Sequence, residues 1–579
     1  MIEKKTIKKP VNKKFQVNKN RKPSSKNLRI IPLGGLEEIG RNMTLFEYGN
    51  DIIIVDCGLM FPEEEMMGID YIIPNIEYLE KKKKNIRGMI ITHGHFDHIG
   101  AIPHIIPRIG NPPIYATELT KALIMRRQED YKDQAPLNLK TVRKIDRITL
   151  GAFQVEFFHV NHSIPDSVGM AIRTPVGTII HTGDFKFDHS PVGDVPADIS
   201  KIARLGSEGI LALMSDSTDA QVEGYSISES KIQENIDAIF AKSKGRIITA
   251  TFSSLVSRIQ QIAVVAEKYG RKLAVDGYSM KSTVEIARRL GYINAKSSTF
   301  IDIKDVNKYP DSKIAILCTG AQGESNAVMM RIINGEHRYV QIHHGDTVIF
   351  SSSVIPGNER TIQGLKDTLF KKGAEVIHYK MMDIHSGGHA RQEDLKMMIN
   401  LVRPQYLIPI HGTYCMLKTH AQLGEELGMK EENTLVGDNG QVFEFDQHGK
   451  GRLTPEKVPS SYVMVDGLGV GDVGNVVLRD RQLLAEDGMF TITVIIDKKK
   501  REIIGEPQVT SRGFIYVKEN FDLVNATKRN VKKIIVHSTS KEAAPNWDYI
   551  KKNIRDDVGK FLFQKTQRRP MVLPVIIEV

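Results

Sequence analysis

Four side chains that commonly bind metal ions fall within six residues, directly after a short apolar stretch that predicts a strand at residues 89–92. They are His93, His95, Asp97 and His98. Burying several imidazoles side by side without a cation is costly, so the cluster predicts a metal site. In an extended or turning segment, His93 and His95 point to one side. One ion does not easily use all four ligands, so we expect two ions, with Asp97 and His98 addressing the second.

Three further candidate ligands lie beyond other predicted strands. His162, Asp184 and His411 each follow a short apolar stretch, where the loops of layered α/β folds carry functional groups. A pair of ions needs a bridging carboxylate, and Asp184 is placed to supply it. Imidazole and carboxylate together suit zinc first, with manganese and magnesium as alternatives that the ligand types do not exclude.

The cysteines and the apolar pattern limit the other classes of protein. The 579-residue chain has three cysteines, Cys57, Cys318 and Cys415, far apart and without a CxxC pair. This excludes a disulfide scaffold and a four-cysteine zinc module. No run approaches the roughly 18 apolar residues of a membrane span. The N-terminus also lacks the apolar core of a secretory signal. We therefore expect a cytoplasmic protein without a membrane span.

Most of the net charge of +11 lies in one segment. Residues 1–26 hold ten Lys or Arg and one acidic residue, Glu3, and so contribute +9. With Pro10, Pro23 and few apolar residues, the segment predicts a disordered basic arm. Two interpretations stay open: a tether for RNA or the ribosome, and a solvated tail that only aids solubility.

The body of the chain changes its pattern along its length. A meander of short strands is expected from residue 28, and helices alternate with strands between residues 228 and 318, which indicates a parallel α/β unit. Polar, Gly-rich sequence after about residue 449 precedes a smaller α+β unit. That unit is expected to have strands at residues 489–496 and 513–517 and helices around residues 523–536 and 547–564.

The sequence His93-Gly94-His95-Phe96-Asp97-His98 resembles the signature of the metallo-β-lactamase fold. That pattern includes an Asp after an early strand, matched by Asp56, and a later His and Asp, matched by His162 and Asp184. The resemblance implies an α/β fold, namely an αββα sandwich with a dinuclear site at one edge.

The segment between Asp184 and His411 resembles the β-CASP insert of nucleic-acid-processing members. Asp216, His389 and His411 match the further motifs of that branch. Outside the basic arm the chain resembles ribonuclease J nearly end to end. The resemblance implies a metallo-β-lactamase domain in two parts (27–220 and 372–449), a β-CASP domain (221–371), a linker (450–470) and a C-terminal oligomerisation domain (471–579), after the basic arm (1–26).

The resemblance also implies an activity. It is 5′-to-3′ exonuclease and endonuclease cleavage of 5′-monophosphorylated RNA, in mRNA decay and rRNA maturation, by hydroxide attack that leaves a 5′-phosphate. Asp216 is expected to orient a ligand or His389, although it could simply cap the following turn. His389 is expected to bind the scissile phosphate or protonate the leaving oxygen. One ion is assigned His93, His95 and His162, the other Asp97, which is also counted as catalytic, with His98 and His411, and Asp184 bridges them.

Two segments are expected beside the 5′-phosphate. The first precedes a predicted helix, so its hydroxyl and backbone N–H groups could cradle an anion, and the glycines of the second allow close backbone approach. Alternatively, each is merely a strand–helix turn. The residues are Phe252, Ser253 and Ser254 in the first segment, and His385, Ser386, Gly387, Gly388 and His389 in the second.

The chain departs from the family pattern at two positions. Phe96 stands where an acid is frequent, and Ser257 where a histidine is common, which affects the electrostatics beside the site and the RNA contacts. Tyr278 and Phe252 are candidates for base stacking, but we expect both in the core.

The expected partners are RNA, a second or further copies in a homodimer or homotetramer through the C-terminal domain, and a paralogue, an RNA-decay complex or the ribosome. Two other functions stay open: a DNA-processing β-CASP nuclease, and a weakly active scaffold for an active paralogue. Because every ligand position is filled, we expect an active enzyme.

Overall fold

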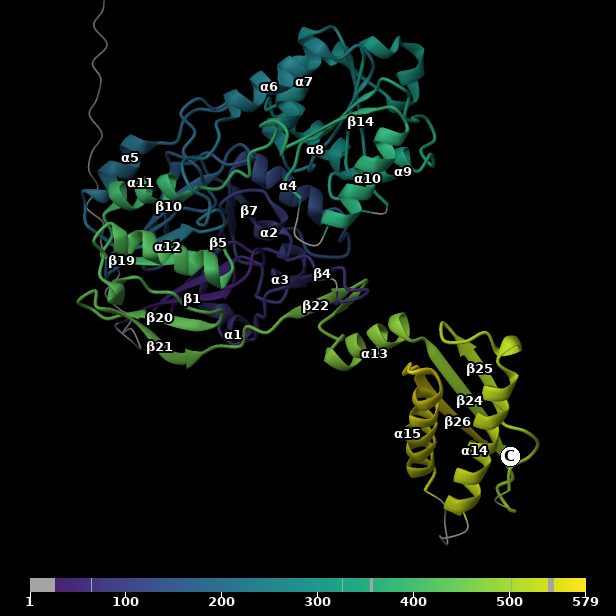
Figure 1. Ribbon diagram of the computed structural model, residues 1–579. Helices are drawn as coiled ribbons and strands as arrows, with labels where there is room; N and C mark the ends of the chain where they lie inside the picture. The colour runs from purple at the N-terminus through teal and green to yellow at the C-terminus, as the bar shows by residue number, and fades with distance from the viewer. Residues whose placement is uncertain (1–26, 64, 325, 355–357, 501, 540–545) are drawn as a thin grey trace, which may run out of the picture. The chain divides into compact units, whose positions relative to one another are not determined.

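The computed structural model describes residues 27–579, except residues 64, 325, 355–357, 501 and 540–545 (Figure 1). The predicted basic arm lies outside the described residues. The chain divides into two compact units, the first comprising residues up to 60 and 73–462, the second residues 61–72 and 463–579. No described helix is both long and apolar enough to cross a membrane.

The first unit begins with an eight-stranded sheet in the order β21-β20-β1-β2-β3-β5-β6-β7. The antiparallel meander β1–β2–β3 is the one predicted from the sequence. In β3, Ile53 and Val55 face the core between the sheets, and Ile52 and Ile54 are buried as well. The strands are β1 (Leu28–Gly34), β2 (Met43–Tyr48), β3 (Asp51–Val55), β5 (Ile86–Ile90), β6 (Ile114–Ala116), β7 (Leu139–Thr141), β20 (Gln441–Phe445) and β21 (Gly451–Lys457).

A six-stranded sheet in the order β19-β12-β11-β10-β9-β8 packs face to face on the first. Phe46 and Ile90 from one sheet meet Phe157 and Met214 from the other in a single apolar core. Each such fully buried side chain contributes about 1.5–3 kcal/mol relative to exposure. The strands are β8 (Arg147–Leu150), β9 (Phe153–His159), β10 (Val168–Arg173), β11 (Thr178–His181), β12 (Ile210–Asp216) and β19 (Tyr406–Ile410).

Helices cover the outer faces of this sandwich. On the second sheet α11 and α12 contact β12 and β19, and on the first α4 contacts β7. The helices are α1 (Glu77–Glu80), α2 (Phe96–Ile99), α3 (Ile102–Ile105), α4 (Glu118–Gln128), α5 (Ile199–Gly206), α11 (Gln392–Val402) and α12 (Tyr414–Glu426). The arrangement is the αββα sandwich predicted from the sequence.

Between β12 and β19 the chain builds a separate parallel sheet in the order β15-β14-β16-β13-β17-β18, at the top of Figure 1. Its faces carry two apolar cores, so both sides are covered, as buried parallel strands require. The strands are β13 (Ile247–Ala250), β14 (Lys272–Asp276), β15 (Phe300–Ile301), β16 (Ile314–Cys318), β17 (Thr347–Phe350) and β18 (Glu375–His378). The helices are α6 (Glu229–Lys242), α7 (Val256–Lys268), α8 (Tyr278–Arg289), α9 (Val328–Ile333) and α10 (Glu359–Lys371).

The second unit contains a sheet in the order β25-β24-β26 with its own apolar core. The predicted strand at residues 513–517 is wrong: the chain pairs at β25, and the glycine at 513 has a φ of +71° that ends the strand. Residues 450–470, predicted as a linker, contain β21 and β22. The elements are α13 (Asn475–Glu486), β24 (Met489–Ile496), β25 (Gln508–Arg512), α14 (Phe521–Thr539), α15 (Trp547–Thr566) and β26 (Met571–Glu578), with a small sheet of β4 (Tyr71–Ile73), β22 (Val463–Asp466) and β23 (Gly469–Val470).

Candidate metal centre

The predicted ligands meet at one edge of the sandwich. Strands β9, β11, β12 and β19 run in the same direction, so their carboxyl ends share that edge. His162, Asp184 and His411 follow β9, β11 and β19, and the cluster that starts at His93 follows β5 in the facing sheet. Residues more than 300 positions apart in the sequence are thereby brought together.

Three imidazoles form the first group. Nε2 of His93 and Nε2 of His162 each lie 3.1 Å from Nδ1 of His95. Burial lowers the pKa of His95 to about 4 and that of His162 to about 3, and it lowers the pKa of His93 as well. All three rings are therefore neutral at pH 7, with ring nitrogens available as ligands of a cation.

Carboxylates and imidazoles form the second group. Oδ2 of Asp97 lies 3.4 Å from Nε2 of His98 and 3.3 Å from Nε2 of His411. Burial alone would lower the histidine pKa values, but the carboxylates, Asp184 foremost, outweigh it. They raise the pKa of His98 and bring that of His411 to about 10. A divalent cation would compete with these protons for the same nitrogens.

Asp184 lies between the two groups. Its Oδ2 is 3.2 Å from Nε2 of His98, 3.7 Å from Nε2 of His93 and 3.9 Å from Nε2 of His162. Its Oδ1 lies 3.3 Å from Nδ1 of His411. One carboxylate therefore faces ligands of both groups, which is the position of a bridge.

Hydrogen bonds from a neighbouring loop fix the backbone of the ligand cluster. Backbone N–H groups of Leu59, Asn42 and Cys57 donate to the carbonyls of Phe96, Asp97 and His98. A Cβ at Gly58 would lie 1.5 Å from the carbonyl oxygen of Asp97, so only glycine permits this approach.

Two non-glycine residues of the centre adopt left-handed backbone conformations, Asp56 at a φ of 64° and His411 at 52°. Such strain persists only where the surroundings over-determine it, and it concentrates at functional sites. The carboxylate of Asp56 accepts from N and Oγ1 of Thr92 and lies 2.8 Å from Nδ1 of His98. Asp56 thereby turns Nε2 of His98 toward the centre.

The donor set fits two divalent cations. His93, His95 and His162 offer three ring nitrogens within 4.8 Å of one another, and Asp97, His98, Asp184 and His411 form a second such group. His411 is buried, and its Nε2 lies 3.3 Å from Oδ2 of Asp97, so the two atoms are close enough to bind the same cation.

Asp216 and His389 form a pair beside the second group. Oδ2 of Asp216 lies 2.8 Å from Nδ1 of His389, and its Oδ1 accepts from N and Oγ1 of Thr218. Asp216 therefore makes both kinds of contact considered from the sequence: it contacts His389, and it caps the turn that follows through Thr218. Burial opposes a charge on His389, but Asp216 outweighs it and raises the pKa of His389 to about 9.

The second predicted phosphate segment, residues 385–389, reaches the centre. The carbonyl of Gly388 lies 2.7 Å from Nδ1 of His162, and a Cβ at Gly388 would lie 2.9 Å from Cβ of Ser163. Nδ1 of His385 is buried without a hydrogen-bond partner among the described residues. Ser386 already has partners, since its Oγ donates to the carbonyl of Ile227.

The first predicted segment is not joined to the centre. Within the described residues, no hydrogen bond or ion pair connects Phe252, Ser253 or Ser254 with the metal ligands. The carbonyls of Phe252 and Ser254 accept from Leu255 and Val256 in a turn that leads into α7. Tyr278, expected in the core, is 74% exposed.

The sequence reasoning missed a buried ionic network beneath the 385–389 segment. Lys186 contacts Oε1 of Glu229 at 3.1 Å and Oγ of Ser386 at 3.3 Å. Arg258 contacts Oε2 of Glu229 at 2.9 Å and donates to the carbonyl of Ile384. No local motif marks these residues, because they lie on separate elements.

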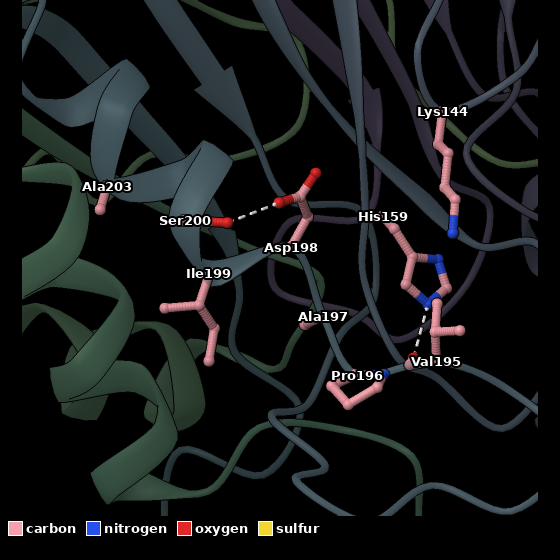
Figure 2. Close-up of a pocket in the computed structure, with 9 residues that line it drawn as sticks. All are labelled: Lys144, His159, Val195, Pro196, Ala197, Asp198, Ile199, Ser200 and Ala203. Carbon is pink, nitrogen blue, oxygen red and sulfur yellow. Dashed lines mark hydrogen bonds between the residues drawn. The ribbon is translucent and has the colours of Figure 1, made fainter.

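A surface pocket of about 590 Å³ lies elsewhere in the first unit (Figure 2). Nε2 of His159 is 3.0 Å from the carbonyl of Val195, and Asp198 accepts from the backbone N–H of Lys201 at the start of α5. The side chains of His159, Asp198 and Ser200 in Figure 2 are thus bonded to neighbouring residues, and no predicted metal ligand lines the pocket.

Comparisons with known proteins identify the family of this chain. The chain is 41% identical to "Ribonuclease J2" of Bacillus subtilis (strain 168) over 559 residues, covering 96% of this chain and 100% of that protein. It is 39% identical to "Ribonuclease J 2" of Staphylococcus aureus (strain MRSA252), covering 96% of this chain and 99% of that one. The chain belongs to the ribonuclease J family.

Family models divide this ribonuclease J member into four matches. They are the metallo-beta-lactamase superfamily (residues 36–218), the ribonuclease J beta-CASP domain (244–369), the Zn-dependent metallo-hydrolase RNA specificity domain (376–436) and the ribonuclease J C-terminal domain (476–579). The family and fold predicted from the sequence are confirmed. A solved protein of unknown function from Enterococcus faecalis V583 has a similar fold, with a TM-score of 0.50 at 16% identity over 74% of this chain and all of that one.

Proposed function

We propose that this protein cleaves 5′-monophosphorylated RNA as a 5′-to-3′ exonuclease and as an endonuclease, in mRNA decay and rRNA maturation. That it is a ribonuclease, and so a phosphodiester hydrolase, follows from its family. The observation that carries the proposal is the position of Asp184. It lies within 3.9 Å of histidines from both ligand groups, and its carboxylate is within 4.8 Å of Asp216 and His389.

We propose that these two groups would hold two divalent ions, zinc first, which would supply a hydroxide nucleophile at neutral pH and offset the charge of the phosphate. Asp56 and Gly388 orient the ligands His98 and His162 through their outer ring nitrogens. His389 is held protonated by Asp216, and it binds the scissile phosphate or donates its proton to the leaving oxygen. The products are a 5′-phosphate and a 3′-hydroxyl.

We further propose that residues 385–389 face the terminal phosphate. The support is their approach to His162 and the unpartnered Nδ1 of His385. A triphosphate end is bulkier and more highly charged, so a monophosphate is the preferred end. Residues 252–254 remain a weaker candidate for binding the terminal phosphate, because their backbone hydrogen bonds are local to the turn.

The proposal extends to the location and the assembly of the protein. We place the protein in the cytoplasm, with RNA as its substrate. Copies assemble as a homodimer or homotetramer through the C-terminal domain. A paralogue, an RNA-decay complex or the ribosome is a further partner.

A test uses one long RNA with either a 5′-monophosphate or a 5′-triphosphate. We expect the wild-type protein with zinc or manganese to degrade the monophosphate form faster. His95→Ala and Asp97→Ala should each lose more activity than the roughly 10–100-fold typical of losing a supporting partner. Unchanged turnover after treatment with a strong chelator would refute the metal-dependent reaction.

Two comparisons separate the alternatives in the same assay. Faster cleavage of DNA of the same sequence would favour a DNA-processing nuclease. RNA left intact by metal-loaded wild-type protein would favour a scaffold for an active paralogue.

A further inference from the structure

We propose that Phe96 and Tyr278, each held against an arginine of α4, are two base-stacking positions on the path by which RNA reaches the metal centre. The inference rests on the proposed ribonuclease function. It adds to it two specific positions for nucleobases. Both rings belong to the first compact unit, so their placement concerns one body of the structure.

Phe96 is an exposed ring inside a buried motif. It lies between the ligands His95 and Asp97, and 47% of it is exposed. Its carbonyl is fixed by the backbone N–H groups of Leu59 and Gly100. The backbone is therefore immobilised by the centre while the ring faces solvent. A flat apolar surface directly beside the metal ligands is suited to the face of a nucleobase.

Tyr278 presents a second exposed ring at the carboxyl end of β14. It is the first residue of α8, follows Gly277 at a φ of +103°, and is 74% exposed. All strands of its sheet are parallel, so this edge gathers the loops after each strand. Ligands of open α/β sheets bind at this edge.

Helix α4 provides one arginine beside each of the two rings. Cζ of Arg126 lies 5.0 Å from the ring centroid of Tyr278, and Cζ of Arg127 lies 5.9 Å from that of Phe96. Consecutive residues of a helix point about 100° apart, so the two arginines reach different neighbours. Figure 1 shows α4 between α8 and α2, and α4 and α8 are in contact. One helix end thus supports a ring from the inserted domain and a ring from the metal centre.

The charges around these arginines favour stacking over a phosphate clamp. Nη1 of Arg126 lies 2.6 Å from Glu129, and Nη1 of Arg127 lies 3.9 Å from Asp130. Both guanidinium groups therefore already face carboxylates. Their contribution is to hold each ring in place, with the open ring surface left for a base. Stacking of this kind tolerates any base, as a general RNA-degrading enzyme requires.

The test removes one base at a time from the RNA. A 5′-phosphorylated oligoadenylate with cleavage-resistant phosphorothioate linkages carries a single abasic nucleotide at each position in turn. Its affinity for the metal-loaded full-length protein is measured by fluorescence anisotropy. For the wild-type protein we expect two sensitive positions, each losing about 5- to 100-fold in affinity.

Phe96→Ala should abolish the abasic penalty at one of these positions, and Tyr278→Ala the penalty at the other. Phe96→Trp and Tyr278→Trp should restore the penalties, because tryptophan offers a larger stacking surface. Phe370→Ala is the matched control: Phe370 is 60% exposed and lies on α10. It should keep both penalties.

The inference is overturned if the wild-type protein shows no sensitive position, or if both penalties persist in the alanine variants. It is also overturned if an alanine variant binds the intact RNA and every abasic RNA more weakly by the same factor, since a purely structural role of the ring predicts that result. Cleavage of ordinary RNA by the wild-type protein decides the ribonuclease proposal separately.

Discussion

His162 and His389 are buried imidazoles whose ring centroids lie 5.0 Å apart, yet their surroundings set opposite charges. His162 has a carbonyl at Nδ1 and other histidines nearby, and burial lowers its pKa to about 3. His389 faces the carboxylate of Asp216, which raises its pKa to about 9 against the effect of burial. One residue is thus prepared as a ligand and the other as a proton donor or cation.

This difference predicts an alkaline limit to the reaction. Because the pKa of His389 is raised, its proton is present at neutral pH and is lost as the pH rises through about 9. We expect kcat to fall above that pH. His389→Gln should lower kcat at neutral pH by roughly 10²- to 10⁴-fold and remove the alkaline decline.

The control is His448→Gln, at an exposed position beyond β20, which should keep the wild-type profile. An unchanged alkaline decline in His389→Gln would show that another group titrates there.

The sequence predicted the residues of the two ligand groups because local spacing carries that information. His93, His95, Asp97 and His98 lie within six residues, and the structure gathers them with the ligands expected after other strands. The role of Asp56 in holding His98 depends on a left-handed φ of 64° and on Thr92, neither of which is visible in composition or spacing.

The ionic network next to segment 385–389 is formed by residues from two domains. Lys186 follows β11 of the sandwich, and Glu229 and Arg258 lie on α6 and α7 of the inserted domain. Glu229 neutralises both cations at a position that is 5% exposed. Loss of this carboxylate would leave Arg258 buried without an acidic partner among the described residues, while Lys186 would keep only Asp188, at 3.4 Å.

Glu229→Gln should therefore lower the free energy of unfolding at pH 7 by about 3–5 kcal/mol. Burial raises the pKa of this carboxyl, but Arg258 and Lys186 outweigh it and lower the pKa to about 2. A depressed pKa means that the contribution is complete above the ordinary value near 4.5 and is lost as the pH falls toward 2. Urea unfolding at pH 7 and at acidic pH measures both effects.

Glu234→Gln on the same helix is the control. Glu234 is exposed and pairs only with Lys231 among the described residues, so its loss should barely change stability. A gap between Glu229→Gln and the wild type that stays constant down to pH 2 would contradict the assigned charge.

At the scale of the whole molecule, all proposed metal ligands lie in the first compact unit, and the second has an apolar core of its own. We expect two thermal transitions in calorimetry. Added zinc should raise the midpoint temperature of the first unit only. At a zinc concentration 100 times the dissociation constant, each site should add about 2.7 kcal/mol to the free energy of unfolding of that unit.

Asp97→Ala should reduce this shift. Equal shifts of both transitions would indicate metal sites outside the proposed centre.

The order of the domains was predictable because the spacing of apolar residues indicates the meander and the helix–strand alternation. The course of the chain beyond residue 449 was harder to predict. Strand β21 alternates weakly and is largely exposed, so its polar sequence resembles a linker, and only pairing with β20 shows that it completes the first sheet. Long-range pairing of this kind has no local signal.

The position of His411 has a consequence for synthesis of the protein. Because of the inserted domain, this ligand is translated 227 residues after Asp184. A nascent chain on the ribosome holds an incomplete set of ligands while its own message is still being read. By the proposed mechanism, a chain at this stage of synthesis would not yet cleave RNA.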